Sequence, residues 1–424
     1  MSLADLERSI ARKLTTFPGL KKKIKYLRSL VFAIISPGRH LTEAVGPLQA
    51  VSDQSSSFFG YFDSSPDNGD GRVLVMQPNG ADNCLPRAVD TIDVKVVDSD
   101  DGSSVYQEST SSFNWQQGCR AHWLTTHEII FNCLDDKAGH HIAKKVSLTE
   151  NTETKIYDRP LQAVFRDKFF VSINYRRLAS AQPEYGYFDL PALSESEMLD
   201  DEDDGIWLVD LRTGISRLIV SLASLRINSD DLAGDFLHSV NHCSISPDGM
   251  NMIFIHRYYN DGRRYDRLYL YGFGDNLLRV LPTDDMVSHY CWVDEKRFVA
   301  YLRLPDQADA YYLFDLETFS FQSLHLERYI SQGDGHPCFK NGWMLTDTYP
   351  DRRRLQHLYA YHFATDQCIK LGQFWAPMAF YGATRCDLHP RFSADGNEVF
   401  LDSCHEGFRR LYRLDVSNIF GNKK

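Results

Sequence analysis

Runs of alternating apolar and polar residues recur along the chain, and each run is divided by a turn. The clearest are GIWLVDLRTGISRLIV, RLYLYGFGDNLLRVL, AYYLFDLETFSFQSL and HLYAYHFATDQCIKL. A period of two is typical of a strand that buries one face, and turn residues between two such strands favour a hairpin. Each run therefore predicts two antiparallel strands.

A second hairpin pattern alternates with these runs and occurs seven times. Each copy begins with a short polar or aromatic segment, continues with a turn that contains Pro, Asp, Asn or Gly, and ends with an apolar strand. The seven segments are 58–76, 116–134, 161–174, 240–258, 287–303, 334–349 and 386–403. Two hairpins make a unit of four strands, and units of 47–53 residues match the blades of a propeller. We therefore expect an all-β fold, a seven-bladed β-propeller.

The seventh unit ends early, at residues 409–416, so its sheet lacks a strand. We expect the segment near 41–52 to complete this sheet and to fasten the ring. The 424 residues then divide into a short helical N-terminal arm over 1–40 and the propeller over 41–424.

The arm over residues 1–40 carries nine Lys or Arg against two Asp or Glu. Its basic residues between Lys21 and Arg28 lie beside an apolar run far shorter than the ~20 residues that span a bilayer. Two interpretations are open: an amphipathic helix on an anionic membrane surface, and a helix packed on the propeller. Because the run also lacks a small-residue cleavage site, we expect a cytoplasmic protein, peripheral at the inner membrane face under the first interpretation.

One interval departs from the period. Between the third and fourth units it grows to about 80 residues, and the excess lies between Leu178 and Asp204. The second half of this insertion contains seven acidic residues: Glu195, Glu197, Asp200, Asp201, Glu202, Asp203 and Asp204. Such a run predicts a solvated surface loop. A long insertion in a regular array is also typical of a lid or a binding loop, so both interpretations stay open.

Composition and motifs exclude several functions. The net charge of −11 and the pI near 5.7 give no broad basic surface, so we expect no nucleic-acid partner. Nine cysteines are scattered singly, which favours reduced thiols over a disulfide framework. The chain has no G-x-S-x-G, Walker, dinucleotide-binding or H-E-x-x-H motif, which argues against a propeller-type serine peptidase or esterase.

Four histidines occupy equivalent positions in four units. They are His242, His289, His336 and His389, at spacings of 47, 47 and 53 residues. Gln117 is assigned to the corresponding place in the second unit. In a propeller such positions converge on the central channel, so the imidazoles and the amide could hold a divalent metal such as manganese. The alternative is that each histidine caps its strand or hydrogen-bonds a neighbouring blade.

Groups suited to polyanionic or sugar ligands surround these positions. The expected substrate-binding residues are Asp334, Asp347, Tyr349, Asp387, Arg391, His256 and His405. Two further arginines can pair with carboxylates: Arg257 and Arg385. The alternative for any one of these groups is a salt bridge between blades. The YGY segment over 185–187 offers phenols for proton transfer, or else anchors the insertion against the third blade.

Taken together, the motifs of the units resemble those of a group of bacterial β-propeller proteins. The motifs are GYFD, NWQQG, YGY, DDGIWLVDL, NH-SPDG, HRY, SH-CW, DGHP, TDTYPD and RCDLHPRFS-DG, and they cover roughly residues 55–416. Proteins of the group are often found among polysaccharide biosynthesis genes and are loosely named after glycosyltransferases or oligogalacturonate lyases. The resemblance implies a seven-bladed propeller that acts on, or binds, carbohydrate.

The group is similar in turn to two kinds of propeller polysaccharide lyase. In oligogalacturonate lyases three histidines and a glutamine hold manganese, which implies a metal role for Gln117, His242, His289, His336 and His389. In ulvan lyases a His and a Tyr transfer protons while an Arg or His neutralises the uronate. By analogy, the catalytic residues here would be His122 or His242, Tyr187, and Arg257 or Arg385.

The expected activity is a metal-assisted β-elimination on a uronate-containing oligosaccharide or polysaccharide of envelope polysaccharide metabolism. Metal or arginine would acidify the proton next to the carboxylate, a base would remove that proton, and an acid would protonate the leaving oxygen. We prefer such an enzyme to the alternative, a non-catalytic propeller that binds glycan or protein partners in polysaccharide biosynthesis.

Overall fold

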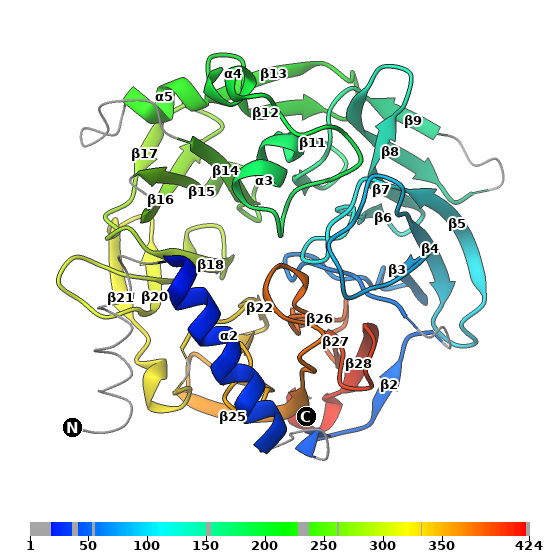
Figure 1. Cartoon of the computed structure of the whole chain (residues 1–424), viewed down its shortest axis with the longest axis vertical. Helices are drawn as coiled ribbons and strands as arrows, with labels where there is room; N and C mark the ends of the chain where they lie inside the picture. The colour runs from blue at the N-terminus through cyan, green and yellow to red at the C-terminus, as the bar shows by residue number, and fades with distance from the viewer. Residues whose placement is uncertain are drawn as a thin grey trace.

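The computed structural model describes residues 18–35, 41–52, 56–149, 154–227, 237–260, 263–331 and 333–420. Seven antiparallel sheets are arranged radially around a common centre (Figure 1). The chain is a seven-bladed β-propeller, which confirms the fold predicted from the repeat.

The first three blades follow one another along the chain. Blade one contains β3 (Arg72–Pro78), β4 (Ile92–Asp98) and β5 (Ser104–Thr110), with an isolated bridge between Phe58 and Met76. Blade two contains β6 (His122–Thr125), β7 (Glu128–Asp135), β8 (His140–Ser147) and β9 (Thr154–Tyr157). Blade three contains β10 (Ala163–Phe165), β11 (Phe169–Ser172), β12 (Gly205–Asp210) and β13 (Ser216–Ser221).

The last four blades continue the ring. Blade four contains β14 (Leu237–Ile245), β15 (Asn251–Asn260), β16 (Arg263–Gly272) and β17 (Leu278–Val280). Blade five contains β18 (Val287–Trp292), β19 (Arg297–Leu302), β20 (Ala310–Asp315) and β21 (Ser320–Ser323). Blade six contains β22 (Cys338–Lys340), β23 (Trp343–Asp347), β24 (Leu355–His362) and β25 (Gln367–Trp375). Blade seven contains β26 (Arg391–Phe392), β27 (Glu398–Ser403) and β28 (Arg410–Asp415).

Blade seven takes its fourth strand from the beginning of the propeller. Strand β2 (Leu48–Ala50) pairs antiparallel with β28, with Leu48 opposite Leu414, which confirms the predicted closure of the ring. Strand β1 (Glu43–Ala44) adds a fifth strand to blade six by pairing with β25, which the repeat did not indicate. The segment before blade one therefore joins the two ends of the ring.

The central strands of the blades are buried on both faces because each blade packs between two neighbours. Strand β15 is buried without a break from Met252 to Tyr258, and its sequence is correspondingly apolar and aromatic. Strand β5, at an outer edge, alternates between exposed and half-buried residues. The place of a strand in its blade also decides its burial, since β16, with the alternating sequence RLYLYG, is buried from Leu268 to Tyr271.

Helix α2 (Pro18–Ile35) lies across the propeller face that is turned toward the viewer in Figure 1. The ring of Tyr26 meets that of Tyr381 edge-on, with centroids 5.2 Å apart. This contact agrees with a helix packed on the propeller. Among the described residues, no helix is both long enough and apolar enough to cross a membrane.

The insertion in blade three folds into two short helices, α3 (Tyr175–Ala181) and α4 (Glu195–Leu199). The Asn174 side chain caps α3 by accepting from the backbone N–H groups of Arg176 and Arg177. The guanidinium of Arg177 is buried, and it binds Asp204 at 2.6 Å and the carbonyl of Met198 at 2.7 Å. A buried cation thus ties the acidic segment to the propeller.

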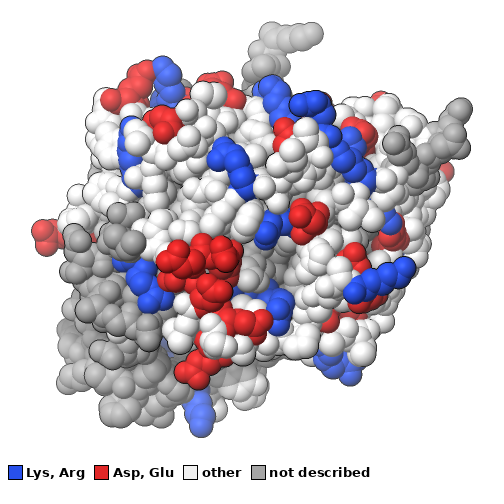
Figure 2. Space-filling view, turned by 90° about the horizontal axis from the view of Figure 1, so that it is seen from above, with Lys and Arg blue, Asp and Glu red and all other residues white. Residues whose placement is uncertain are grey.

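Several acidic side chains of the insertion nevertheless face solvent. Glu195, Glu202 and Asp203 are exposed, as the acidic run predicted. Figure 2 shows acidic side chains gathered among basic ones on the edge of the molecule that carries α4. The remaining short elements are α5 (Leu222–Ile227), α6 (Ser417–Phe420), η3 (Leu326–Arg328) and η4 (Gly382–Thr384).

Candidate functional site

A cavity of about 770 Å³ opens on the propeller face that carries α2 and the insertion. Its walls come from blades four to six, from the loop before blade seven, from the insertion and from α2. Six residues singled out from the sequence line it: His242, Arg257, His289, Asp334, Tyr349 and Arg385. The propeller therefore brings these residues together although 143 positions separate the first from the last.

The charged lining of this cavity is mainly basic. It comprises six arginines and three carboxylates: Arg28, Arg257, Arg264, Arg352, Arg354, Arg385, Glu184, Asp334 and Asp351. An excess of guanidinium groups in a concave site attracts anionic ligands and pairs with carboxylates. The lining thus suits a negatively charged substrate.

The four histidines of the repeat lie side by side at this site. The ring centroids of His242 and His289 are 5.4 Å apart, those of His289 and His336 are 4.2 Å apart, and those of His336 and His389 are 4.2 Å apart. All four side chains are buried. The convergence expected from their equivalent positions is therefore present.

The strand register corrects the residue assigned to blade two. In blade four, His242 has a φ of 57° and lies two residues before Ser244, where pairing with the next strand resumes. In blade two, pairing begins at His122, and the residue two positions before it is Arg120, with a φ of 54°. Arg120 therefore takes the place that the sequence assigned to Gln117.

Three side chains form a group that could hold a metal ion. One ligand atom from each of His336, Asp387 and His389 lies within 4.8 Å of the others. Nε2 of both histidines and Oδ1 of Asp387 are buried without a hydrogen-bond partner among the described residues. Imidazole and carboxylate suit divalent metals such as manganese, and buried unpaired ligand atoms fit a site completed by an ion.

The first histidine of this group is held by a buried carboxylate. Nδ1 of His336 lies 2.8 Å from Oδ1 of Asp347. Burial would lower the pKa of His336, but the charge of Asp347 and this hydrogen bond outweigh burial and raise the pKa. Asp347, expected to bind substrate, instead orients a candidate metal ligand.

His289 lies beside this group and belongs to a hydrogen-bonded relay. The Ser288 hydroxyl is 2.9 Å from Asp334 Oδ2 and 3.0 Å from Nδ1 of His289. An ionised carboxylate only accepts, so Ser288 donates to Asp334 and accepts from Nδ1–H of His289. Burial and the nearby His336 lower the pKa of His289 to about 4. The ring is therefore neutral at pH 7, with the lone pair on Nε2.

His242 is surrounded by phenols. Its Nδ1 shares a hydrogen bond with the hydroxyl of Tyr61, and its ring meets that of Tyr185 edge-on at 4.8 Å. Tyr185 lines the cavity, and its hydroxyl lies 3.5 Å from the guanidinium of Arg385. Burial raises the pKa of Tyr185, so the phenol keeps its proton at neutral pH. A protonated phenol at the cavity wall can donate a proton.

Two buried carboxylates position the predicted arginines. Nε of Arg385 donates to Asp387 at 2.6 Å, and Nε of Arg257 donates to Asp266 at 2.5 Å. Nη1 of Arg257 also donates to Gln182, at 2.6 Å. Burial would lower the pKa of Arg257, but Asp266 outweighs it and keeps the group cationic. Each guanidinium retains N–H groups for a ligand carboxylate.

Tyr187 lies outside the cavity, contrary to the catalytic role expected for it. Its ring stacks on that of Tyr175 with centroids 4.0 Å apart, and its hydroxyl accepts from Nδ2 of Asn132 at 2.9 Å. The side chain is completely buried in the core between blades. Tyr187 anchors the insertion, and the phenol that reaches the cavity is the one two residues earlier, Tyr185.

Four other predicted site residues belong to the framework of the propeller rather than to the cavity. Arg391 donates to the carbonyl of Gly60 at 2.6 Å and to Asp402 at 2.8 Å, so it joins blade seven to blade one. The remaining three side chains do not line the cavity: His122 in β6, His256 bonded to His238, and His405 packed on Tyr412. These positions do not support the catalytic or substrate-binding roles predicted for them.

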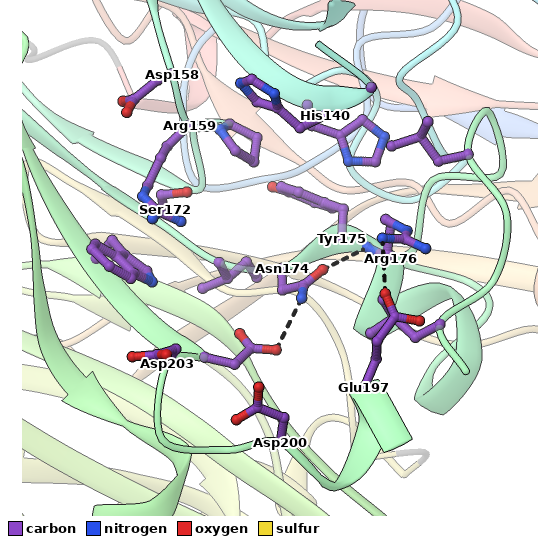
Figure 3. Close-up of a pocket in the computed structure, with 18 residues that line it drawn as sticks. His140, Asp158, Arg159, Ser172, Asn174, Tyr175, Arg176, Glu197, Asp200 and Asp203 are labelled. Carbon is purple, nitrogen blue, oxygen red and sulfur yellow. Dashed lines mark hydrogen bonds and ion pairs between the residues drawn. The ribbon is translucent and has the colours of Figure 1, made fainter. Parts of the chain in front are cut away.

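A second cavity of about 540 Å³ lies between the insertion and blades two and three (Figure 3). Figure 3 shows Glu197, Asp200 and Asp203 on its insertion side and Asp158 and Arg159 opposite. Its charged lining has five carboxylates, the four named and Asp204, against two arginines. This excess of negative charge disfavours an anionic glycan.

Two functional groups were missed in the sequence, Tyr61 and Ser288, and the YGY segment was singled out without showing that Tyr185 is the phenol that reaches the cavity. Tyr61 had a detectable signal, because it lies five residues before Pro66, as His242 lies five residues before Pro247. Its ring centroid is 5.4 Å from that of His242. Nothing in the sequence pattern distinguished Ser288, the second residue of β18, from other serines in strands.

No protein-family model and no curated protein sequence matches the chain. Among solved structures it is similar to an oligogalacturonate lyase from Vibrio parahaemolyticus, with 13% identity, a TM-score of 0.51, and 89% of this chain and 98% of that chain covered. It is also similar to an oligogalacturonate lyase in complex with manganese, with 12% identity, a TM-score of 0.39, and 88% and 98% covered. The tricorn protease gives 11% identity, a TM-score of 0.49, and 89% and 34% covered. Likeness at this identity shows the propeller fold and leaves the activity open.

Proposed function

We propose that the protein is a carbohydrate-active lyase that cleaves a uronate-containing oligosaccharide by metal-assisted β-elimination. One observation carries the proposal: His336, Asp387 and His389 converge within 4.8 Å beside a cavity lined by Arg257 and Arg385. A bound metal and cations that bind carboxylate are two means of acidifying a proton next to a uronate carboxylate.

The three residues of the metal group would hold a divalent ion such as manganese through two imidazole nitrogens and one carboxylate oxygen. When bound, the ion supplies positive charge that stabilises the carbanion developing next to the carboxylate. Asp347 keeps His336 in the tautomer whose Nε2 carries the lone pair. The residues of the chain contribute to this step by orienting the metal ligands.

The arginines would bind the uronate. Arg385 is held by Asp387 and Arg257 by Asp266, so both guanidinium groups are positioned before substrate arrives. Fixed cations in a partly enclosed cavity stabilise developing negative charge without reorganisation during the reaction. This arrangement favours substrates with a carboxylate over neutral sugars.

His289 is the best-placed base. The relay through Ser288 to Asp334 fixes its Nδ1 proton and leaves the Nε2 lone pair available, and the ring borders both the cavity and His336. This assignment replaces the metal-ligand role expected from the sequence. Nε2 would take the C5 proton of the uronate, and the electrons of that C–H bond would form the C4–C5 double bond.

Tyr185 is the best-placed acid. Its hydroxyl remains protonated because burial raises its pKa, and it lies at the cavity wall next to Arg385. As the C4–O bond breaks, the leaving oxygen would take the phenolic proton, and water would restore both groups afterwards. The products would be an unsaturated uronate and a shorter saccharide.

The biological setting forms part of the same proposal. Its support is the motif resemblance to propellers encoded among polysaccharide biosynthesis genes. We propose that the substrate belongs to envelope polysaccharide metabolism and that the enzyme acts in the cytoplasm. A non-catalytic glycan-binding propeller is the competing outcome of the test below.

The test combines metal analysis with product detection. Purified protein is incubated with Mn²⁺, freed of unbound ion, and analysed for retained metal. The same sample is mixed with uronate oligosaccharides while the ultraviolet absorbance of an unsaturated product is followed. We expect retained metal, product formation, and a loss of about 10²–10⁴-fold in rate for His289→Ala and Tyr185→Phe.

The matched control is Tyr187→Phe, which removes a phenol two residues from Tyr185 but outside the cavity. It should leave the rate near that of the unchanged protein. A folded protein that binds uronate oligosaccharides, retains no metal and yields no unsaturated product would establish the non-catalytic propeller instead.

A further inference from the structure

Helix α2 exposes a stripe of apolar side chains. Ile24, Leu27, Val31 and Ile34 are 44%, 60%, 44% and 72% exposed. Their spacings of three, four and three residues place them on one face of the helix. Four large apolar residues in a continuous stripe are costly to leave in water, which indicates a surface that binds something.

The opposite face of α2 is turned toward the propeller. Tyr26 contacts Tyr381 edge-on, and Ser29 and Leu30 are half-buried. Ser29 lines the large cavity from this face, and Arg28 borders the cavity from the side of the helix between Ser29 and the stripe. The apolar stripe therefore faces away from the propeller. The helix is also a border of the cavity, so whatever binds the stripe is held beside the cavity's opening.

Basic residues accompany the stripe. Four of the five residues 21–25 are lysines, and Lys23 and Arg28 are exposed. At about 100° per residue, Lys23 projects on one side of the stripe and Arg28 on the other. An apolar face bordered by cations is typical of a helix that lies in the plane of an anionic membrane surface.

We infer that α2 docks the protein on an anionic lipid bilayer, with the stripe inserted among the lipids and the basic residues at the phosphates. The helix would lie in the membrane plane, since no described helix is long and apolar enough to cross a bilayer. A second copy of the chain is a poorer occupant, because the sequence of α2 contains five basic residues and no acidic one, so it offers no opposite charge to its own copy. A bilayer supplies the opposite charge.

Docking through the apolar stripe of α2 determines where the large cavity opens relative to the bilayer. Because Arg28 and Ser29 both belong to α2 and line the cavity, the cavity would open close to the bilayer surface. A glycan attached to a lipid could then enter it without leaving the membrane. This orientation holds whether the propeller cleaves or only binds glycan, so the docking stands apart from the lyase chemistry.

Vesicle binding by the whole 424-residue chain tests the inference. The protein is sedimented with vesicles of phosphatidylcholine, and separately with vesicles of phosphatidylcholine mixed with phosphatidylglycerol. We expect binding to the anionic vesicles, weakened by salt, and little binding to the neutral ones. The double substitution Leu27→Asn with Ile34→Asn should lower the bound fraction at least about tenfold, and Lys23→Glu should also weaken binding.

The matched control is Ile215→Asn, which removes an apolar side chain of similar exposure, 70%, from the turn between β12 and β13. It should bind as the unchanged protein does, and circular dichroism of every variant should show an intact propeller. The inference would be overturned if the unchanged protein did not bind anionic vesicles, or if the double variant bound them as well as the unchanged protein does. A lipid-free dimer that the double variant abolishes would also overturn it, because the stripe would then bind a second copy.

Discussion

Nδ1 of His336 lies 2.8 Å from Oδ1 of Asp347, and both side chains are buried. The same carboxylate accepts the backbone N–H of His336 at 2.8 Å and, through Oδ2, that of His389 at 3.1 Å. Burial would raise the pKa of Asp347, but His336 and these hydrogen bonds outweigh burial and lower it. One carboxylate therefore orients two of the three candidate metal ligands.

Replacing this carboxylate should weaken metal binding. Asp347→Asn keeps the shape of the side chain but loses its charge, so we expect the affinity for Mn²⁺ to fall by about 10–100-fold. Isothermal titration of the purified protein with Mn²⁺ measures the effect. The control is Asp309→Asn, which removes an exposed carboxylate paired with Arg303. Equal affinities for both variants would mean that Asp347 does not serve a metal site.

The two tyrosines of the YGY segment should separate activity from stability. Tyr185→Phe removes the phenol at the cavity and should lower the rate of unsaturated product formation while changing stability little. Tyr187→Phe removes the group that accepts from Asn132 and should lower the free energy of unfolding by about 1 kcal/mol with activity retained. Urea unfolding and product absorbance measure the two effects. The opposite result would assign the acid to Tyr187.

Arg391 should be essential for stability rather than for substrate binding. Its buried guanidinium bonds to Asp402, which also accepts the backbone N–H groups of Phe59 and Gly60. Arg391→Ala leaves that carboxylate without its cation, so we expect a loss of about 3–5 kcal/mol in the free energy of unfolding.

Urea unfolding measures this loss against Arg297→Ala, which breaks a half-exposed pair with Asp294. The control should change the free energy of unfolding by less than about 1 kcal/mol. A stable Arg391→Ala protein with weakened saccharide binding would return Arg391 to the substrate-binding role.

The fold was predictable because its signals repeat. Seven turns and strands at one period outweigh errors in any single blade, and the short seventh unit pointed to the strand at 48–50 that completes it. Strand β1 was not predictable, because Glu43 and Ala44 are too few to show a pattern. Its pairing with β25, extended by the hydrogen bond from the N–H of Val45 to the carbonyl of Leu371, joins segments more than 300 residues apart, which two residues cannot indicate.

The site was predictable only where it follows the repeat. The four histidines share one position in their blades and converge, and Tyr61 shares that position as well. In blade two the loop before β6 has several polar residues. The register of this loop depends on backbone hydrogen bonds, which cannot be read from the amino-acid sequence. Arg120 rather than Gln117 therefore occupies the blade-two position that is equivalent to the positions of the histidines.

For residues in irregular segments, the sequence did not predict which way each side chain points. Tyr185 and Tyr187 are separated by Gly186, at which a Cβ atom would lie 2.1 Å from the backbone of Ala179. That close approach to α3 turns one ring into the cavity and the other into the core. No pattern of apolar and polar residues carries such information, because it arises from packing between segments.

His122 should make the stability of the protein depend on pH. Burial and the nearby Arg120 lower the pKa of His122 to about 3 in the folded protein, whereas an unfolded histidine has a pKa of about 6.5. Between these values the unfolded chain binds a proton that the folded protein does not. The free energy of unfolding therefore falls as the pH falls below 6.5, by about 2 kcal/mol at pH 5 from this residue.

Urea unfolding of the unchanged protein and of His122→Gln, at pH 7 and at pH 5, isolates this contribution. The glutamine variant cannot take up the proton, so its loss of stability between the two pH values should be smaller by about 2 kcal/mol. His325→Gln is the control, since it removes an imidazole whose side chain is 64% exposed, and it should lose as much stability as the unchanged protein. If His122→Gln also showed the full loss, His122 would already be accessible to protons in the folded state.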